Sequence, residues 1–319
     1  MLKHPSAELR LVRVAAACDI GIDIRRYDLL AADGRPLAAF DAGSHLDVHV
    51  PSGAVRQYSL CGDPQMHDRY TIAVKRERSG RGGSVSMHDD VEVGSVLGIE
   101  GPRNLFPLAA AARRSLLIAG GIGITPIYAM ARALNAESKD WELHYCARSE
   151  QHAAFYAELR ELSPARVHPY FSEAPLLDAG ALLRSPDETT DIYCCGPQGL
   201  MESVIAASAH WREGSVHFEW FAAPDSRSGP NQAFEVALLR SGLVLTIPPD
   251  RSILQVVREH GIDVQSACEE GVCGTCETRL LSGEAEHRDM LLSAGERAAN
   301  GSMMICCSRA KSPRLELDL

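Results

Sequence analysis

The chain has 319 residues, 45% of them hydrophobic and 23% charged, as expected for a soluble globular protein of two or three domains. Its formal net charge of -10 argues against a general nucleic-acid binder, because affinity for phosphate backbones comes largely from Lys and Arg. No apolar run reaches the roughly 18 residues of a membrane span, and residues 1–13 lack the apolar stretch of an export signal. We therefore expect a cytoplasmic, monomeric protein without nucleic-acid or membrane partners.

The first third of the chain predicts an antiparallel β-barrel. Between residues 11 and 107, short β-like stretches alternate with Gly, Pro and Asp. The clearest stretches are residues 46–50, 57–60 and 70–74.

Two short motifs in this region carry groups that suit a phosphate and an apolar ring. Arg56 and Tyr58 are two apart on one predicted strand and so face the same side, next to the hydroxyl of Ser59. The Arg-Gly-Gly-Ser segment at 81–84 adds backbone N–H donors, a hydroxyl and a second cation. Each motif alone also occurs as an ordinary strand or turn, so their weight comes from occurring together.

The middle of the chain predicts a doubly wound parallel sheet with a dinucleotide site. Strand patterns at 115–119, 142–146, 167–171 and 191–195 alternate with helical patterns such as 127–134 and 153–162. The glycine-rich segment 120–126 follows the first strand and opens a helix, where backbone N–H groups can meet a pyrophosphate. A second small-residue turn, 195–199, ends a later strand. Two such turns at one sheet edge favour a ligand cleft over a simple tight turn.

The C-terminal third carries an iron-sulfur pattern. After a polar linker, hairpin and helix patterns lead to Cys268, Cys273 and Cys276, spaced C-x4-C-x2-C, with Cys306 and Cys307 about thirty residues further on. This is the spacing of a plant-type [2Fe-2S] centre, which passes one electron at a time. Structural zinc usually takes two C-x2-C hooks, and disulfides would need an oxidising compartment, so both are weaker alternatives. Spacing alone leaves the fourth ligand open between Cys306 and Cys307.

Several other patterns have simple structural explanations. The sequence His287-Arg-Asp289 is similar to a kinase catalytic loop, but no phosphate-binding loop accompanies it, and we expect a structural hydrogen-bond corner. Three histidines on predicted strands are expected to be satisfied core or surface groups: His144, His168 and His217. Four cysteines in or beside apolar runs are expected in the core: Cys18, Cys61, Cys146 and Cys194.

The motifs occur in the order found in the phthalate dioxygenase reductase family, which the chain resembles over essentially its whole length. The family includes vanillate O-demethylase and phenoxybenzoate dioxygenase reductases. The resemblance rests on Arg56-x-Tyr-Ser59, Ala73-Val-Lys75, Arg81-Gly-Gly-Ser84, Gly120 to Pro126, Cys195-Gly-Pro197, His217-Phe-Glu-Trp-Phe221 and the cysteine loop. It implies an antiparallel flavin-binding β-barrel (1–107), a Rossmann-like parallel α/β NAD-binding domain (108–224), a linker (225–231) and a β-grasp plant-type [2Fe-2S] ferredoxin (232–319).

The resemblance also implies the cofactors FMN, NADH and [2Fe-2S] and the residues that hold them. Ser59, Cys195, Glu219 and Phe221 would line the place of hydride transfer. FMN would contact Arg56, Gln57, Tyr58, Ser59, Ala73, Val74, Lys75, Arg81, Gly82, Gly83, Ser84, Thr125 and Phe221. NADH would contact Gly120, Gly121, Gly123, Thr125, Pro126, Arg148, Ser149, Cys195, Gly196 and Pro197. The iron ligands would be Cys268, Cys273, Cys276 and Cys306, the last chosen by the family signature Cys-x-Ser-Arg.

One departure concerns the nucleotide. The family has an acidic residue after an arginine beyond the second parallel strand, whereas this chain reads Arg148-Ser149-Glu150. An acid there would accept hydrogen bonds from the ribose and repel a 2′-phosphate, which Arg148 and Ser149 would tolerate. We expect NADH, with NADPH as the alternative.

The family resemblance implies that electrons pass to a Rieske-type oxygenase acting on an aromatic acid or methyl ether. Residues 232–319 hold 13 acidic and 9 basic side chains, an excess of negative charge that would suit a transient complex with a basic partner. The alternative is an iron-sulfur carrier or redox sensor without NADH chemistry.

Overall fold

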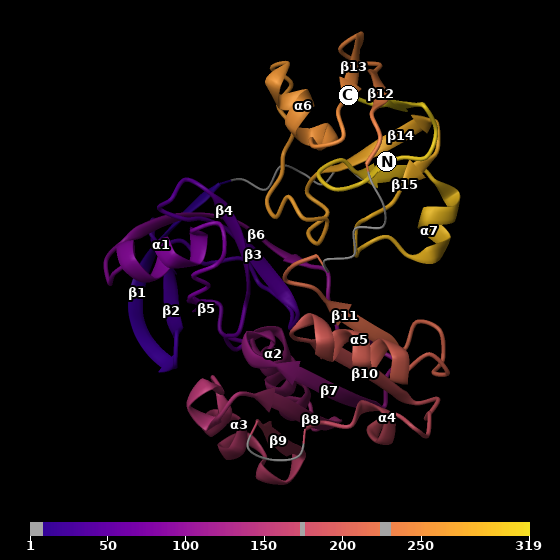
Figure 1. Ribbon diagram of the computed structural model, residues 1–319. Coiled ribbons are helices and arrows are strands. Elements are labelled where there is room, and N and C mark those ends of the chain that lie inside the picture. Colours follow the sequence, from indigo (N-terminus) through magenta and orange to yellow (C-terminus); the bar gives the residue numbers. More distant parts are fainter. Residues whose placement is uncertain (1–8, 173–175, 224–230) are drawn as a thin grey trace. The chain divides into compact units, whose positions relative to one another are not determined.

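The computed structural model describes residues 9–172, 176–223 and 231–319. Contacts divide the chain into two compact units, Met1–Glu219 and Trp220–Leu319, and each is described by itself. Figure 1 shows the elements of both units. None of the helices in the described ranges combines the length and apolar character that a membrane crossing requires.

The first unit begins with a six-stranded antiparallel sheet, which confirms the expected β-barrel fold. Its strand order is β4-β3-β6-β1-β2-β5. Leu60 and Ile72 form an isolated antiparallel bridge that links the two ends of the curled sheet. The helix α1 (Gly83–Asp90) buries Met87 against the sheet's core. The strands are β1 (Arg10–Gly21), β2 (Ile24–Ala31), β3 (Ser44–His49), β4 (Val55–Ser59), β5 (Tyr70–Lys75) and β6 (Val96–Asn104).

One expectation about this sheet was wrong: Cys18 is exposed instead of buried. Val12 and Val14 point into the core, and strict alternation would turn Cys18 the same way. The pairing of β1 with β2 shifts between Val14 and Ala16, and this bulge reverses the face to which later side chains point.

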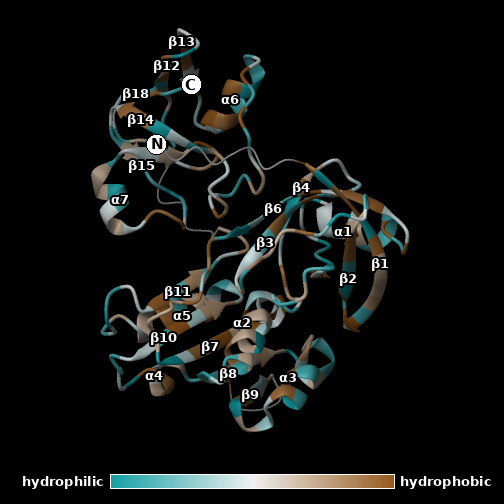
Figure 2. Cartoon of the chain, turned by 180° about the vertical axis from the view of Figure 1, so that it is seen from behind, coloured by the Kyte–Doolittle hydropathy of each residue, from teal (hydrophilic) through white to brown (hydrophobic). Residues whose placement is uncertain are grey.

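The same unit continues with a five-stranded parallel sheet of order β11-β10-β7-β8-β9, which confirms the doubly wound prediction. Trp141, Leu143 and Tyr145 of β8 join the core formed with helix α2, while Cys194 of β10 meets Met201 of α5 through its sulfur. Figure 2 shows the hydrophobic character of β7 and β10. The elements are β7 (Arg114–Gly120), α2 (Ile124–Ala136), β8 (Asp140–Ala147), α3 (Tyr156–Leu162), β9 (Val167–Phe171), α4 (Ala179–Leu182), β10 (Thr190–Cys195), α5 (Gln198–Ala207) and β11 (Val216–Glu219).

The second unit is a mixed sheet of order β13-β12-β18-β14-β16 with its own core. Strands β12 and β18 pair in parallel, whereas β12 pairs with β13 in the predicted hairpin. Helix α6 buries four aliphatic side chains and starts at a capping box of Ser252 and Gln255. The elements are β12 (Phe234–Leu238), β13 (Leu243–Ile247), α6 (Ile253–Glu259), β14 (Glu277–Ser282), β15 (Ala285–Glu286), α7 (Ala294–Ala299), β16 (Ser302–Met304), β17 (Arg309–Ala310) and β18 (Arg314–Leu317).

A buried arginine ties the start of this unit to its end. Arg309 donates hydrogen bonds to the backbone oxygens of Arg251 (2.8 Å), Gln232 (2.9 Å) and Pro248 (3.0 Å). Its guanidinium carbon lies 5.0 Å from the centre of the Phe234 ring. Because these partners are distant in sequence, Arg309 fixes the fold around the cysteine loop.

Candidate functional site

The Arg-Gly-Gly-Ser segment lies against Arg56, as the sequence predicted. Gly82 has a φ of 81° and precedes α1, whose first turn has no side-chain cap. A Cβ on Gly83 would lie only 2.7 Å from Nε of Arg56. The glycines thus let the arginine approach a helix N-terminus, and this combination of cation and backbone N–H groups suits a phosphate.

The neighbouring predicted flavin contacts have mixed environments. The Gln57 side chain donates to Oδ1 of Asp47 at 3.0 Å, which leaves its backbone for any contact with FMN. Ser84 Oγ accepts the backbone N–H of Glu77 at 3.0 Å. The hydroxyl of Tyr58 is buried without a hydrogen-bond partner among the described residues, and burial raises its pKa. An orphaned hydroxyl beside Arg56 fits the expectation that this strand faces a ligand.

Three further predicted flavin contacts lie on β5: Ala73, Val74 and Lys75. Ala73 and Val74 are buried, whereas Lys75 is exposed and its Nζ lies 3.5 Å from Oε2 of Glu77. The backbone oxygen of Val74 lies 2.9 Å from Nε2 of His88, so contact of this strand with FMN stays a prediction.

The two glycine turns of the nucleotide domain meet at one sheet edge. Strands β7 and β10 pair in parallel, with Ala119 opposite Cys195. A Cβ on Gly123 would lie 2.3 Å from the carbonyl oxygen of Cys195, and one on Gly120 would lie 2.5 Å from Cδ of Pro197. Only glycine allows such an approach, so both turns contribute to one cradle at the carboxyl edge.

Helix α2 follows the first glycine turn, and its first turn has features typical of a helix start. No side chain caps α2, and Thr125 Oγ1 donates to the backbone oxygen of Ile122 at 3.1 Å. Pro126 lies in the first turn, where its missing N–H costs no helical hydrogen bond. The N–H of Ile124, the first residue of α2, donates to the backbone oxygens of Gly121 and Ile122, so the contact of this turn with NADH stays a prediction.

The barrel and the parallel sheet meet at Ser59 and Glu219. Ser59 ends β4 and donates from Oγ to Oε2 of Glu219, which ends β11, at 3.2 Å. Cys195 pairs with Glu219 in the register of β10 and β11. Three predicted catalytic residues are thus brought together from strands far apart in sequence.

The electrostatics of this edge keep both ionisable groups neutral at neutral pH. Burial raises the pKa of Glu219 to about 8, and the hydrogen bond from Ser59 lowers it in part. Burial, together with the charge of Glu219, raises the pKa of Cys195 well above its ordinary value. Cys195 is therefore a thiol and not an activated nucleophile, as the sequence had indicated.

The roles of three further predicted site residues, Phe221, Arg148 and Ser149, stay predictions. Phe221 belongs to the second unit and is 44% exposed, so its role near the hydride site stays a prediction. Arg148 is exposed beyond β8, while Oγ of Ser149 lies 2.8 Å from Nδ1 of His152. Glu150 is also exposed, and the preference for NADH over NADPH stays a prediction as well.

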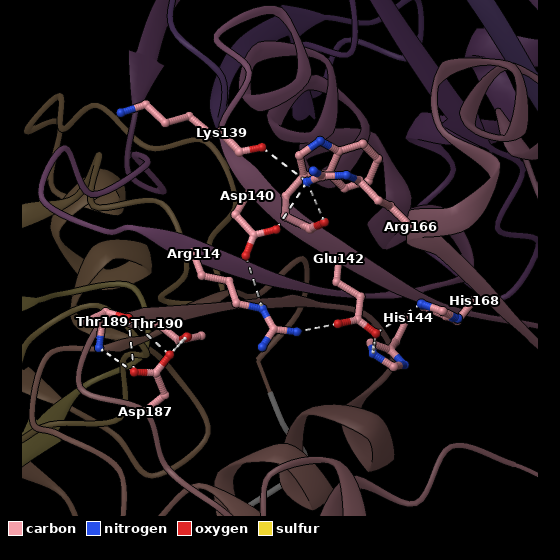
Figure 3. A network of polar contacts seen from close by, with 11 residues as sticks. Arg114, Lys139, Asp140, Glu142, His144, Arg166, His168, Asp187, Thr189 and Thr190 are labelled. Atoms are coloured by element: carbon pink, nitrogen blue, oxygen red, sulfur yellow. Dashed lines mark hydrogen bonds and ion pairs between the residues drawn. The ribbon is translucent and has the colours of Figure 1, made fainter.

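The histidines of β8 and β9 belong to a polar network drawn in Figure 3. Oε1 of Glu142 lies 3.0 Å from Nε2 of His168 and 3.3 Å from Nε2 of His144, and Oε2 accepts from Arg114 at 2.5 Å. Nδ1 of His144 lies 2.9 Å from the Tyr170 hydroxyl. Burial lowers the pKa of His144 to about 4, so this imidazole is a neutral, structural group.

The cysteine loop is shaped to surround sulfur atoms. The backbone N–H groups of Glu270 and Val272 point to Sγ of Cys268 at 3.3 and 3.5 Å. Gly271 and Gly274 have φ angles of 78° and 75°, which turn the loop inward. Backbone donors aimed at a thiolate are what a bound iron-sulfur cluster requires.

The four predicted ligands are buried and their sulfurs converge. Cys268 is hydrogen-bonded to Cys273 and Cys306, and these contacts lower its pKa. Cys306 also contacts Cys276 and Cys307. Cys307 packs toward Gly271 of the same loop, where a Cβ would lie 2.5 Å from its Sγ. Cys306 as the fourth ligand therefore stays a prediction.

In residues 9–172, 176–223 and 231–319, no three His, Cys, Asp or Glu side chains surround one point as a single metal ion requires. A [2Fe-2S] cluster instead takes its four cysteines as two pairs, one pair on each iron.

Sequence reasoning missed one part of this site. It expected a hydrogen-bond corner at residues 287–289, and Asp289 indeed accepts the N–H groups of Leu291 and Leu292 through Oδ2. It did not anticipate that Met290 donates to the Gly271 oxygen at 2.9 Å, which places the corner directly behind the cysteine loop. No local sequence pattern predicts this hydrogen bond between Met290 and Gly271.

Comparisons with known proteins agree with both halves of the site. A family model described as an oxidoreductase NAD-binding domain matches residues 117–205, and one described as a 2Fe-2S iron-sulfur cluster binding domain matches residues 236–311. The chain is 46% identical to the phthalate 4,5-dioxygenase oxygenase reductase subunit of Pseudomonas putida over 313 residues, which is 97% of this chain and 96% of that protein. It is also 46% identical to the vanillate O-demethylase oxidoreductase of Pseudomonas putida, covering 96% of this chain and 98% of that one.

Solved structures extend the likeness. The crystal structure of phthalate dioxygenase reductase matches with a TM-score of 0.75 and 42% identity and covers 98% of both chains. An intact type IV self-sufficient cytochrome P450 monooxygenase matches with a TM-score of 0.89 and 40% identity, covering 98% of this chain and 41% of that one.

Proposed function

The chain belongs to the phthalate dioxygenase reductase family, and on that premise we propose that it oxidises NADH through FMN and passes single electrons through a [2Fe-2S] cluster to an oxygenase. The observation that carries this proposal is that one chain holds both a glycine cradle joined to the Ser59–Glu219 edge and four converging buried cysteines. A carrier or sensor without NADH chemistry would not need the first of these sites.

Bound FMN supplies a ring that accepts a hydride and releases its electrons singly, and a bound [2Fe-2S] cluster supplies a one-electron carrier. The chain's own residues then bind and orient. Arg56, with the N–H groups of Gly83 and Ser84, would hold the phosphate of FMN. The cradle of Gly120, Gly123 and Gly196 would hold the pyrophosphate of NADH.

The residues at the hydride edge would control charge and approach. Cys195 is small and neutral, so it lets the nicotinamide come close without competing as a nucleophile. Glu219, protonated at neutral pH, places no charge beside the reacting ring. Ser59 would orient the flavin through its hydroxyl.

The partner is an oxygenase, as in the phthalate 4,5-dioxygenase and vanillate O-demethylase systems for which its relatives are named. We propose that it is of the Rieske type and that its substrate is an aromatic acid or a methyl ether, following the phthalate and vanillate systems of those relatives. The 13 acidic and 9 basic side chains of residues 232–319 support docking to a basic surface.

We further propose a cytoplasmic, monomeric reductase. All ten cysteines are free, which suits a reducing compartment. Size-exclusion chromatography with light scattering tests the oligomeric state, and a dimer mass would contradict this part of the proposal.

A visible spectrum recorded before and after anaerobic addition of NADH tests the main proposal. Flavin and iron-sulfur bands should both bleach. A cluster that NADH does not bleach, in a protein without flavin, would indicate a carrier or sensor. A Cys273→Ser variant should lose cytochrome c reduction while NADH still reduces its flavin.

A further inference from the structure

A buried pair of ionisable residues lies behind the cysteine loop and has no role in the proposed function so far. The side chains of His287 and Asp289 are 7% and 0% exposed. One oxygen of Asp289, Oδ2, accepts the backbone N–H groups of Leu291 at 3.2 Å and Leu292 at 2.9 Å. This oxygen is satisfied by the structural corner.

The other side of the pair is not satisfied. Oδ1 of Asp289 lies 3.7 Å from Nδ1 of His287, which is too long for a hydrogen bond. In the part of the chain that the structure describes, neither this oxygen nor either ring nitrogen of His287 has a hydrogen-bond partner. Buried polar atoms are rarely left this way, so a purely structural corner does not explain the imidazole.

The pair is in contact with the loop between the first two predicted ligands. Met290 donates its N–H to the oxygen of Gly271 at 2.9 Å. A Cβ on Gly271 would lie 3.0 Å from Cα and 3.3 Å from Cβ of Asp289. Asp289 therefore packs directly against the backbone that links Cys268 to Cys273.

A second cation lies close to this carboxylate. Nη2 of Arg297 is 3.7 Å from Oδ2 of Asp289, and Nε of Arg297 donates to the Leu292 oxygen at 2.9 Å. Among the described residues, Asp289 thus has an imidazole nitrogen 3.7 Å from one oxygen and a guanidinium nitrogen 3.7 Å from the other.

We propose that His287 and Arg297 are positioning residues that hold and partly balance the charge of Asp289 behind the cysteine loop, and so set how readily the cluster accepts an electron. Reduction adds negative charge to the cluster, and a carboxylate buried in a low-dielectric region opposes it. A polar ring or a cation beside that carboxylate weakens the opposition. This inference rests on the proposed function, because it takes the four cysteines to be the cluster ligands.

A redox titration of the cluster in the full-length protein, followed by the EPR signal of its reduced form, tests the proposal. Asp289→Asn keeps an oxygen for Leu291 and Leu292 but removes the charge, so the cluster should become about tenfold easier to reduce, or about 59 mV for one electron. His287→Phe removes the imidazole and keeps an aromatic ring, so the potential should fall. Glu284→Gln, an exposed acid paired with Lys311, is the control and should leave it unchanged.

Iron and sulfide analysis of each variant separates the outcomes. Unchanged potentials in fully loaded Asp289→Asn and His287→Phe proteins would overturn the inference and leave the proposed function intact. A wild-type protein without a cluster would overturn both. If these variants lose the cluster, the Arg297→Gln variant decides, because Arg297 is half-exposed. Its replacement should lower the potential of the cluster. An unchanged potential would refute the role of the charge.

Discussion

Ser59, Cys195 and Glu219 illustrate how far single residues could be read from the sequence. Family resemblance selected all three, and the structure brings them to one edge. The protonation state of Glu219 could not be predicted from the sequence. Its pKa depends on burial between strands that are 160 residues apart in the chain. The same holds for Asp289, whose contact with the cysteine loop is purely tertiary.

The raised pKa of Glu219 predicts a pH dependence near the hydride site. Above about pH 8 the ionised carboxylate should draw the Ser59 hydroxyl toward itself, and flavin reduction by NADH should slow about tenfold, the effect of about 1.4 kcal/mol. Stopped-flow absorbance recorded over a series of pH values on both sides of pH 8 would measure this change in rate. Glu219→Gln should show no such step, and an identical pH profile in this variant would disprove the assignment.

The same group predicts a change in stability. Its folded pKa of about 8 exceeds the ordinary value of 4.5, so between these values the folded protein binds a proton that the unfolded chain does not. The free energy of unfolding should therefore fall as pH rises through this window. Urea denaturation at both ends of the window should show a smaller difference in Glu219→Gln than in the wild type.

The choice between Cys306 and Cys307 can be tested directly. Cys306 contacts both Cys268 and Cys276, whereas Cys307 packs toward Gly271. We expect Cys306→Ser to lose the cluster and Cys307→Ser to keep it, as measured by iron content and visible absorbance. Loss of iron in the Cys307 variant alone would reverse the assignment.

At the scale of elements, hydrophobic patterning predicted the central parallel strands β7 and β10 well because they are buried on both faces. Helix starts were harder to predict. The pattern at 153–162 predicted a helix over the whole stretch, but α3 begins at Tyr156, because Phe155 adopts a left-handed φ of 60°. Such a conformation depends on packing around Phe155, which lies stacked on Tyr128.

The contact of the two glycine turns predicts a sharp difference between two glycines. Gly123→Ala would place its Cβ 2.3 Å from the backbone of Cys195, which has no flexible end to move away, so we expect about 1–3 kcal/mol of destabilisation and weaker NADH binding. Gly199→Ala in α5 has nothing within 4 Å and should be neutral or slightly stabilising. Thermal unfolding and the KM for NADH measure both variants, and equal behaviour would argue against the close contact.

For the whole molecule, the sequence predicted three domains, whose bounds stay a prediction, and the first two share one compact unit by contacts. One hydrophobic cluster explains this union. It joins Ile24 and Ala73 of the antiparallel sheet to Leu117 and Ala119 of the parallel sheet. Periodicity shows which residues are buried but not which buried faces share a core, so this union was not predictable.

Separate cores predict separate unfolding of the two units. The core of the second unit contains Cys276 and Cys306, so losing the cluster should weaken that unit alone. Differential scanning calorimetry of Cys273→Ser should show one transition moved to lower temperature and the other, with its flavin, unchanged. A single transition that shifts as a whole would indicate that the units unfold together.

The role of Arg309 changes what the signature Cys-x-Ser-Arg can tell a sequence search. In this chain Cys306 of that signature contacts Cys268 and Cys276. Ser308 accepts the N–H of Arg288 at 3.2 Å, and Arg309 donates to three backbone carbonyls. The Ser and Arg positions of the signature thus report contacts that stabilise the fold, and they do not report iron binding. A homologue that had lost its metal would still score well on them, so a search for working clusters should weigh the cysteines separately from the arginine.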